Sequence, residues 1–289
     1  MRPAIPSRLR SLATLAGLAG LLAGACGTAL GADPEILRVS GCGTDLATFR
    51  LLGEAFRKVH PDTRVEVLPS LGSAGGIKAV AAGALDLGLS TRPLTGEEGR
   101  QGVTAVPYAR TPLVVAVPRR SRTTDVTTRQ LADLYAGVTR TWADGTPVRL
   151  VLRPATDTDT SLLMTLSPEV SAAVARALAR EGLVVAATDQ EAADTLEKVP
   201  GALGSTTLAL IRAEGRRLTP LRLNGVTPSP EAVGSGRYPL AKTLYLVLGP
   251  SPAGRRFLAF LGSPEARRIL EETGHVPLPL GSADTGKGP

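Results

Sequence analysis

Two segments of the chain combine residue types that suit the binding of a small anion. Residues 71–78 (LGSAGGIK) place a glycine-rich turn and a serine directly before a helical pattern, and residues 85–93 (LDLGLSTRP) end a strand pattern with hydroxyls and an arginine. The N-terminus of a helix has unpaired backbone N–H groups and the positive end of the helix dipole, and both attract an anion. Gly–Ser-rich turns also serve as plain connections, so the two segments form a pocket only if the fold brings them together.

The pattern of apolar residues predicts elements that would do so. In the first third of the chain, predicted strands alternate with predicted helices, and Phe49, Leu52, Phe56 and Val59 mark one face of the first helix. The expected order is strand 36–39, this helix, strand 64–68, helix 77–84 and strand 85–89. Such an order predicts a parallel sheet covered by helices, with the ligand at the carboxyl ends of the strands. Both segments fall at that edge.

A second alternating series follows residue 111. Its predicted strands are 112–117, 148–152, 184–187, 202–205 and 243–248, and its predicted helices are 128–135, 168–181, 189–198 and two that begin near residues 252 and 264. The long apolar strands 112–117 and 243–248 are natural crossovers between two lobes. We therefore expect an α/β protein whose ligand cleft lies between lobes that can close over it. The expected lobes are 35–112 with 243–280 and 113–242, and residues 281–289 are expected to be a disordered tail.

The first 32 residues have the features of an export signal. Arg2, Arg8 and Arg10 form a basic start, and residues 12–25 are a short apolar run that ends in small residues. The run is shorter than the roughly 20 apolar residues of a membrane span, so a cleaved signal peptide is expected. Cleavage could follow residue 31 or 32, or residues 21–26 (LLAGAC) could be a lipoprotein signal with the lipid on Cys26. Either alternative predicts an exported protein.

Charge and cysteine content narrow the class of function. Removal of the three arginines in residues 1–32 leaves 30 basic against 26 acidic residues, a net charge of +4. This modest positive charge suits small anionic ligands. Aromatic residues make up only 3% of the chain and no basic run contains them, so nucleic-acid binding is not expected. Cys42 is the one cysteine left after the signal, which excludes a disulfide framework.

No pattern of catalytic residues is evident. The two histidines, His60 and His275, are far apart in the sequence, and no metal-ligand spacing occurs. The glycine-rich segment matches neither the G-x-S-x-G nucleophile elbow nor the phosphate-binding G-x-x-x-x-G-K-[ST] motif. We therefore expect a binding protein without a cofactor or metal, rather than an enzyme.

Seven short motifs are spread over the chain. They are GCGT at 41–44, GSAGG at 72–76, DLGLSTRPL at 86–94, GALG at 201–204, YPLAKTLY at 238–245, FLAFLGSP at 257–264 and GHVP at 274–277. Taken together, they resemble the periplasmic phosphate-binding proteins of ABC importers, which have the type 2 periplasmic binding protein fold. The motifs occur in the family's order and cover essentially all of residues 35–280.

The resemblance implies a set of ligand-binding residues. In the first lobe, a hydroxyl and backbone N–H groups near Asp45 would serve after the first strand, and a serine in the glycine-rich segment would bind the ligand. In the second lobe, the main anion-binding arginine would stand at the end of the strand 148–152. Carried onto this chain, the residues expected to contact the ligand are Thr44, Asp45, Ser73, Thr91, Arg92, Arg153, Asp157 and Thr158.

One segment departs from the family. After its arginine the family usually has a Ser-Gly-Thr turn, whereas this chain has RPATDTDT at 153–160. Asp157 and Asp159 stand where hydroxyls are usual, and Asp45 stands where another donor is usual. A carboxylate about 4 Å from a doubly charged phosphate costs several kcal/mol at an effective dielectric constant near 20. Either these aspartates point away from the ligand, for example by capping their helix, or the ligand is not phosphate.

The resemblance implies a solute-binding protein that captures phosphate or a similar small oxyanion and delivers it, as a monomer, to an ABC permease in the inner membrane. The alternative is a divergent member of the same fold that acts as a sensor or accessory protein with a different or lost ligand. The segment that contains Asp157 and Asp159 separates these two hypotheses.

Overall fold

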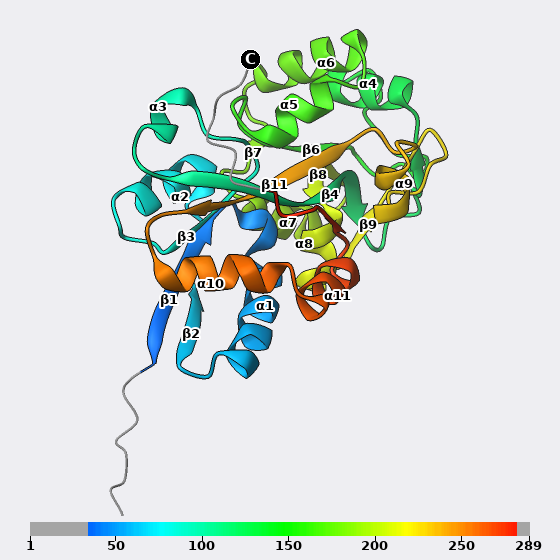
Figure 1. The fold of residues 1–289 in the computed structure, drawn as a ribbon. Helices are drawn as coiled ribbons and strands as arrows, with labels where there is room; N and C mark the ends of the chain where they lie inside the picture. The colour runs from blue at the N-terminus through cyan, green and yellow to red at the C-terminus, as the bar shows by residue number, and fades with distance from the viewer. Residues whose placement is uncertain (1–33, 282–289) are drawn as a thin grey trace, which may run out of the picture. The chain divides into compact units, whose positions relative to one another are not determined.

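The first alternating series folds as a β-α-β-α-β unit (Figure 1). The computed structural model describes residues 34–281. The unit consists of β1 (Glu35–Gly41), the 3-10 helix η1 (Gly43–Asp45), α1 (Leu46–Val59), β2 (Thr63–Val67), α2 (Gly72–Ala81) and β3 (Leu87–Ser90). Its strands are parallel, in the order β2-β1-β3. Phe49, Leu52 and Phe56 of α1 are fully buried, but Val59 is 61% exposed, so the prediction that Val59 lies on the buried face is wrong.

Helix α2 begins at Gly72 and not at residue 77, because the glycines form part of the helix rather than a turn before it. A Cβ atom added to Gly76 would lie 2.7 Å from the Cα of Gly41. Glycine at this position therefore lets α2 lie directly against β1. Ser73 is inside the helix and does not cap it, since the N-cap residue is Leu71 and has no side-chain cap hydrogen bond.

Two strands join the halves of the main sheet, β4 (Thr104–Pro118) and β11 (Ala241–Leu248). They lie next to each other in its middle, in the order β2-β1-β3-β11-β4-β8-β6-β7 (Figure 1). Strand β11 is antiparallel to both β3 and β4. Residues 104–112 of β4 pair with β11, and residues 113–116 pair with β8. Strand β4 therefore belongs to both halves, which is why its apolar residues are buried along nearly its whole length.

The second half repeats the alternation of strands and helices. It contains α4 (Thr128–Ala136), β6 (Arg149–Leu152), α5 (Thr158–Met164), α6 (Pro168–Leu178), β7 (Val184–Val185), α7 (Asp189–Lys198), β8 (Ala202–Thr207), α8 (Leu208–Ala213) and α9 (Pro230–Gly234). Strands β8, β6 and β7 are parallel. The α/β class with parallel strands flanked by helices is confirmed, with the difference that the central strands are antiparallel.

Several elements have local sequence signals. The serines of two Ser-Pro pairs, Ser251 and Ser263, cap α10 (Pro252–Leu261) and α11 (Pro264–Glu272), each by accepting a backbone N–H. The short elements that the sequence pattern did not predict are α3 (Gly96–Gly99), β5 (Asp125–Val126), β9 (Leu218–Pro220), β10 (Arg222–Leu223) and β12 (Val276–Pro277). Helices α8 and α9 were not predicted either, and α5 was anticipated only as the helix that the aspartates of residues 157–159 would cap.

The buried apolar side chains form clusters that draw on different parts of the chain. Two clusters use residues 37–109 and 244–270, and two others use residues 113–240. On this basis we keep the lobes 35–112 with 243–280 and 113–242 as a proposal. The expectations for residues 1–32, including Cys26, and for residues 282–289 lie outside the described residues. Within 34–281, no helix is both long and apolar enough to cross a membrane.

Candidate functional site

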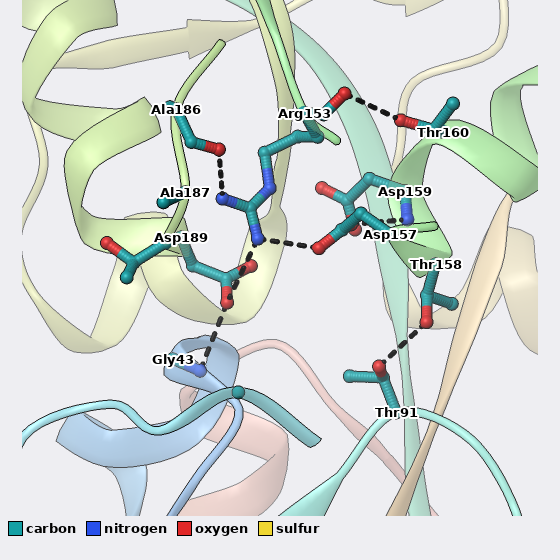
Figure 2. A network of polar contacts seen from close by, with 12 residues as sticks. Gly43, Thr91, Arg153, Asp157, Thr158, Asp159, Thr160, Ala186, Ala187 and Asp189 are labelled. Carbon is teal, nitrogen blue, oxygen red and sulfur yellow. Dashed lines mark hydrogen bonds and ion pairs between the residues drawn. The ribbon is translucent and has the colours of Figure 1, made fainter. Parts of the chain in front are cut away.

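The carboxyl end of β1 leads into the N-terminus of α1, where the first predicted ligand groups lie. Thr44 is 1% exposed, and its neighbour Gly43 presents a backbone N–H at this helix end. Both groups contact a carboxylate that was not predicted, that of Asp189, the first residue of α7. The N–H of Gly43 donates to Asp189 Oδ2 at 3.0 Å (Figure 2). The Thr44 hydroxyl donates to Asp189 Oδ1 at 3.3 Å.

Two buried cations face the same carboxylate. Arg153, at the end of β6, lies with its Nη2 3.9 Å from Asp189 Oδ2 and 2.7 Å from Asp157 Oδ2, and its Nη1 donates to the carbonyl of Ala186 at 2.8 Å (Figure 2). Lys242, from β11, lies with its Nζ 3.7 Å from Asp189 Oδ1 and forms an ion pair with Asp159. Arg153 and Lys242 are 6% and 2% exposed. We call Arg153, Asp157, Asp159, Asp189 and Lys242 the charge cluster.

Mutual attraction within the charge cluster outweighs the cost of burial for three of its members. Burial alone would favour neutral side chains. For Lys242, burial lowers the pKa, but Asp159 and Asp189 more than compensate and hold the pKa above its ordinary value. For Asp189, burial raises the pKa, but Lys242 and Arg153 hold it below its ordinary value. The pKa of Arg153 is raised because neighbouring carboxylates outweigh its burial. Asp189 is therefore a carboxylate anion in the folded protein.

Asp159 differs from Asp189. Its burial is complete, and this burial raises the pKa of its carboxyl despite the ion pair with Lys242. The charge cluster holds two cations and three carboxyl groups, so it contains no surplus positive charge when all five groups are ionised. An anionic ligand would therefore add negative charge to a site whose two cations are already balanced by carboxylates of the chain.

Asp157 has the capping role that the sequence suggested. It is the N-cap of α5, and its Oδ1 accepts the backbone N–H of Asp159 at 2.8 Å. Its other oxygen accepts from Arg153. Both carboxylate oxygens of Asp157 are therefore engaged within the chain.

The carboxylate of Asp45 contacts a different group of side chains. It accepts a hydrogen bond from the Tyr108 hydroxyl and lies with its Oδ1 3.0 Å from Nε2 of His275. All three residues are almost completely buried. The structure thus places the Asp45 carboxylate in a contact with Tyr108 and His275 rather than with the charge cluster.

The hydroxyl groups of Ser73, Thr91 and Thr158 contact one another beside the charge cluster. Thr91 Oγ1 lies 2.9 Å from Thr158 Oγ1 (Figure 2). Ser73 Oγ lies 3.2 Å from Thr91 Oγ1. Three predicted ligand residues from α2, the end of β3 and the start of α5 are therefore brought together.

Arg92 is engaged by a residue close to it in the chain. Its Nη1 and Nη2 each lie 2.7 Å from an oxygen of Glu98, which also closes a capping box with Thr95 on α3. This arginine holds the pKa of Glu98 at about 2, below its ordinary 4.5. A fork of this kind is a strong form of charge-assisted hydrogen bond, so Arg92 could bind a ligand only by releasing Glu98.

We expect the substitution Arg92→Gln to raise the pKa of Glu98 from about 2 toward its ordinary 4.5. The lowered pKa means that the pair stabilises the fold above the unfolded pKa of Glu98, and that this contribution is lost as the pH falls through the folded value. The carboxyl chemical shift of Glu98, followed by NMR against pH, measures the change. A pKa that stays near 2 would contradict the assigned pairing.

Two members of the charge cluster, Asp189 and Lys242, were not predicted from the sequence. Asp189 follows a strand and opens a helix, which is the pattern used to identify the other segments. Lys242 interrupts an otherwise apolar strand, and a buried lysine requires an anionic partner. Within residues 34–281, no group of three or more His, Cys, Asp or Glu side chains is arranged to hold a metal ion.

Comparison with known proteins identifies the family. The model of the PBP superfamily domain matches residues 28–265, which is most of the chain. The chain belongs to the PBP superfamily. This match confirms the resemblance to periplasmic binding proteins that the sequence motifs indicated. It also supports the prediction of a binding protein rather than an enzyme.

Relatives within the superfamily include proteins named for phosphate binding. Phosphate-binding protein PstS 2 of Streptococcus agalactiae is 29% identical over 106 residues, which are 37% of this chain and 36% of that protein. The chain thus matches only about a third of the length of this relative. Phosphate-binding protein PstS of Bacillus subtilis is 24% identical over 255 residues, 84% of this chain and 80% of that protein.

Solved structures share the superfamily fold. A Clostridium perfringens protein crystallised with bound phosphate, and named as a phosphate ABC transporter substrate-binding protein, has a TM-score of 0.70 at 20% identity and covers 84% of this chain and 100% of its own. The periplasmic molybdate-binding protein of Azotobacter vinelandii has a TM-score of 0.58 at 17% identity, with 84% and 99% coverage. These likenesses confirm the fold class.

Proposed function

We propose that the chain is an extracytoplasmic solute-binding protein that takes up phosphate or a similar small oxyanion for an ABC importer. The ligand would lie at the N-terminus of α1, between Gly43 and Thr44 on one side and Arg153 on the other. The relatives named for phosphate binding support this ligand class.

The observation that carries the proposal is the set of groups that surround the Asp189 carboxylate. A backbone N–H, a hydroxyl, a guanidinium and an ammonium group converge on two oxygen atoms that carry one negative charge. These are the kinds of donor that bind oxyanions in proteins. The site is therefore chemically suited to an oxyanion, and it holds the carboxylate of Asp189.

Further donors are available beside this position. The Nε of Arg153 is buried and has no hydrogen-bond partner in the described part of the chain. The hydroxyls of Ser73, Thr91 and Thr158 bond to one another, so each could turn toward an incoming oxygen. A protonated oxyanion could donate its proton to one of the nearby carboxylates.

The remaining parts of the proposal concern location and partners. We propose lobes 35–112 with 243–280 and 113–242, which close over the ligand by a hinge in the central strands. We further propose export to the periplasm by residues 1–32, with lipidation of Cys26 as the alternative to its removal, and delivery by the monomer to a permease. No nucleic acid and no cofactor take part.

Isothermal titration of the ligand-free protein with phosphate, sulfate, molybdate and small organic acids tests the function. We expect one of the oxyanions to bind with a Kd below millimolar. The substitution Arg153→Lys keeps the charge but removes the planar fork, and should weaken binding by about tenfold to a hundredfold, as expected for the loss of a charge-assisted hydrogen bond. Arg149→Ala, at the exposed start of the same strand, is the matched control and should leave the affinity unchanged.

Two outcomes would contradict different parts of the proposal. If no oxyanion binds below millimolar concentration, the oxyanion function is wrong, and the alternative of a relative with a different or lost ligand takes its place. If an oxyanion binds equally well to the natural chain and to Arg153→Lys, the function stands and the assigned site is wrong.

A further inference from the structure

The side chain of Asp189 occupies the place where an oxyanion ligand would bind. Its two oxygens accept from the Gly43 N–H and from the Thr44 hydroxyl, and they face Arg153 and Lys242 at 3.9 and 3.7 Å. Two of the donors on which the proposed function depends, the Gly43 N–H and the Thr44 hydroxyl, thus bond to a carboxylate of the chain itself. The two cations lie within ion-pair distance of the same carboxylate. In Figure 2 the Asp189 side chain points from the second half of the chain toward Gly43.

The carboxylate is electrostatically well matched to this position. It lies at the N-terminus of α1, where the helix dipole favours a negative charge. Its pKa is held below the ordinary value by Lys242 and Arg153 although burial opposes this. The group is therefore ionised, as a bound oxyanion would be, and it is already desolvated, with 8% of the residue exposed.

The contact leaves no room for a second anion. Gln190, next to Asp189 in α7, donates from its Nε2 to the carbonyl of Gly43 at 2.8 Å. A Cβ atom added to Gly43 would lie 2.3 Å from Oε1 of Gln190 and 2.9 Å from Oδ2 of Asp189. A methyl group on Gly43 would thus overlap the ends of these two side chains where they stand, so a phosphate-sized group can bind there only after the Asp189 side chain has moved.

We propose that Asp189 is an internal competitor for the oxyanion, and that ligand binding displaces its carboxylate from Gly43 and Thr44. This inference rests on the proposed function. A group tethered within the chain competes at an effective concentration on the order of millimolar or higher. Asp189 therefore lowers the affinity for every anion. The effect is largest for ligands that bind these donors no more strongly than a carboxylate does. A tetrahedral dianion with more oxygens than a carboxylate is the ligand class able to displace it.

The test compares phosphate binding to the natural chain and to two variants by isothermal titration calorimetry. Asp189→Asn keeps the shape of the side chain and removes its charge, and Asp189→Ala removes the whole group. We expect both variants to bind phosphate at least about tenfold more tightly than the natural chain, since the tethered competitor is gone. Asp194→Asn, on the same helix but paired with Arg216 at the surface, is the control and should bind like the natural chain.

A second measurement decides the inference without reference to phosphate. The cavity left by Asp189→Ala should accept a free carboxylate, so formate should raise the melting temperature of this variant and have no comparable effect on the natural chain or on Asp194→Asn. Chloride at equal ionic strength controls for salt. If Asp189→Ala does not fold, Asp189→Asn still reports through phosphate affinity.

The outcomes separate the inference from the proposed function. Phosphate binding that is equal or weaker in both Asp189 variants overturns the inference, while binding by the natural chain upholds the function. Absence of oxyanion binding in all variants overturns the function, and rescue by formate then still supports the internal carboxylate site. Absence of both binding and rescue overturns both.

Discussion

Replacing Lys242 with methionine is expected to lower the free energy of unfolding by about 3–5 kcal/mol at neutral pH, the usual cost of removing one partner from a buried ion pair. The substitution preserves most of the side-chain volume. It leaves Asp159, which is 1% exposed, without its cation, and it removes one of the two cations that face Asp189. Chemical denaturation measures the loss.

The deficit of Lys242→Met should depend on pH. Burial raises the pKa of Asp159 even beside Lys242, and removal of the lysine should raise this pKa further. A carboxyl group whose folded pKa exceeds its unfolded pKa contributes stability at low pH that is lost as the pH rises. The raised pKa of Lys242 in the natural chain, by contrast, keeps its contribution constant below about pH 10. The difference between the two chains should therefore shrink as the pH is lowered from 7 to 5.

Two variants control for this interpretation. Lys198→Met removes an exposed lysine that is paired with Asp194 on α7, and such surface pairs contribute about 0–1 kcal/mol. The double variant Lys242→Met with Asp159→Asn removes the stranded charge and should recover part of the stability. A loss below about 1 kcal/mol for Lys242→Met alone would show that the buried pair is not as assigned.

Replacing Gly41 with alanine is expected to cost more than about 4 kcal/mol or to prevent folding, because the added methyl group meets fixed backbone. Gly41 has a φ of +144°, and an ideal Cβ there would lie 2.1 Å from the carbonyl oxygen and 2.5 Å from the nitrogen of Leu89. Leu89 is the pairing partner of Gly41 between β1 and β3. Relief of the clash would separate these strands just before the turn that carries Gly43.

Gly72→Ala is the matched comparison for Gly41→Ala. Gly72 also has a positive φ, +68°, but nothing lies within 4 Å of its added Cβ. Its replacement should cost about 1–2 kcal/mol, the strain of a left-handed residue alone. Thermal and chemical denaturation of the two variants gives the loss of stability in each, and the difference measures the cost of the clash at Gly41. Equal losses in the two variants would contradict the clash.

Much of the fold was accessible from local sequence signals. The helix 189–198 was predicted with the bounds that α7 has, and the Ser-Pro pairs marked the starts of α6, α10 and α11, because side-chain caps act within one helical turn. The prediction failed at α2, where glycines were taken for a turn. Glycine is needed there because α2 lies directly against β1. This contact joins segments that are distant in the sequence, so no local sequence pattern reveals it.

The site was less accessible for the same reason. Thr44, Arg153 and Asp157 were predicted as its members, and the structure places them around Asp189. The charge cluster, however, depends on Lys242. Because β11 pairs with β4, this lysine lies beside Asp159 and Asp189, which are more than 50 residues earlier in the chain. Asp45 was expected near the ligand, but Tyr108 and His275, both remote in sequence, take up its oxygens. Each predicted site role stays a prediction until the titrations are made.

The position of β11 between β3 and β4 makes the centre of the sheet depend on a strand from late in the chain. Strands β6, β7 and β8 come from one continuous stretch of chain, so they can pair early. Strand β3 and the first part of β4 cannot be joined until residues 241–248 are available, since β11 fills the space between them. Until then each presents an unpaired edge, which is a template for association with other chains. The late strand also delivers Lys242, so the charge cluster is assembled only after nearly the whole chain has been made.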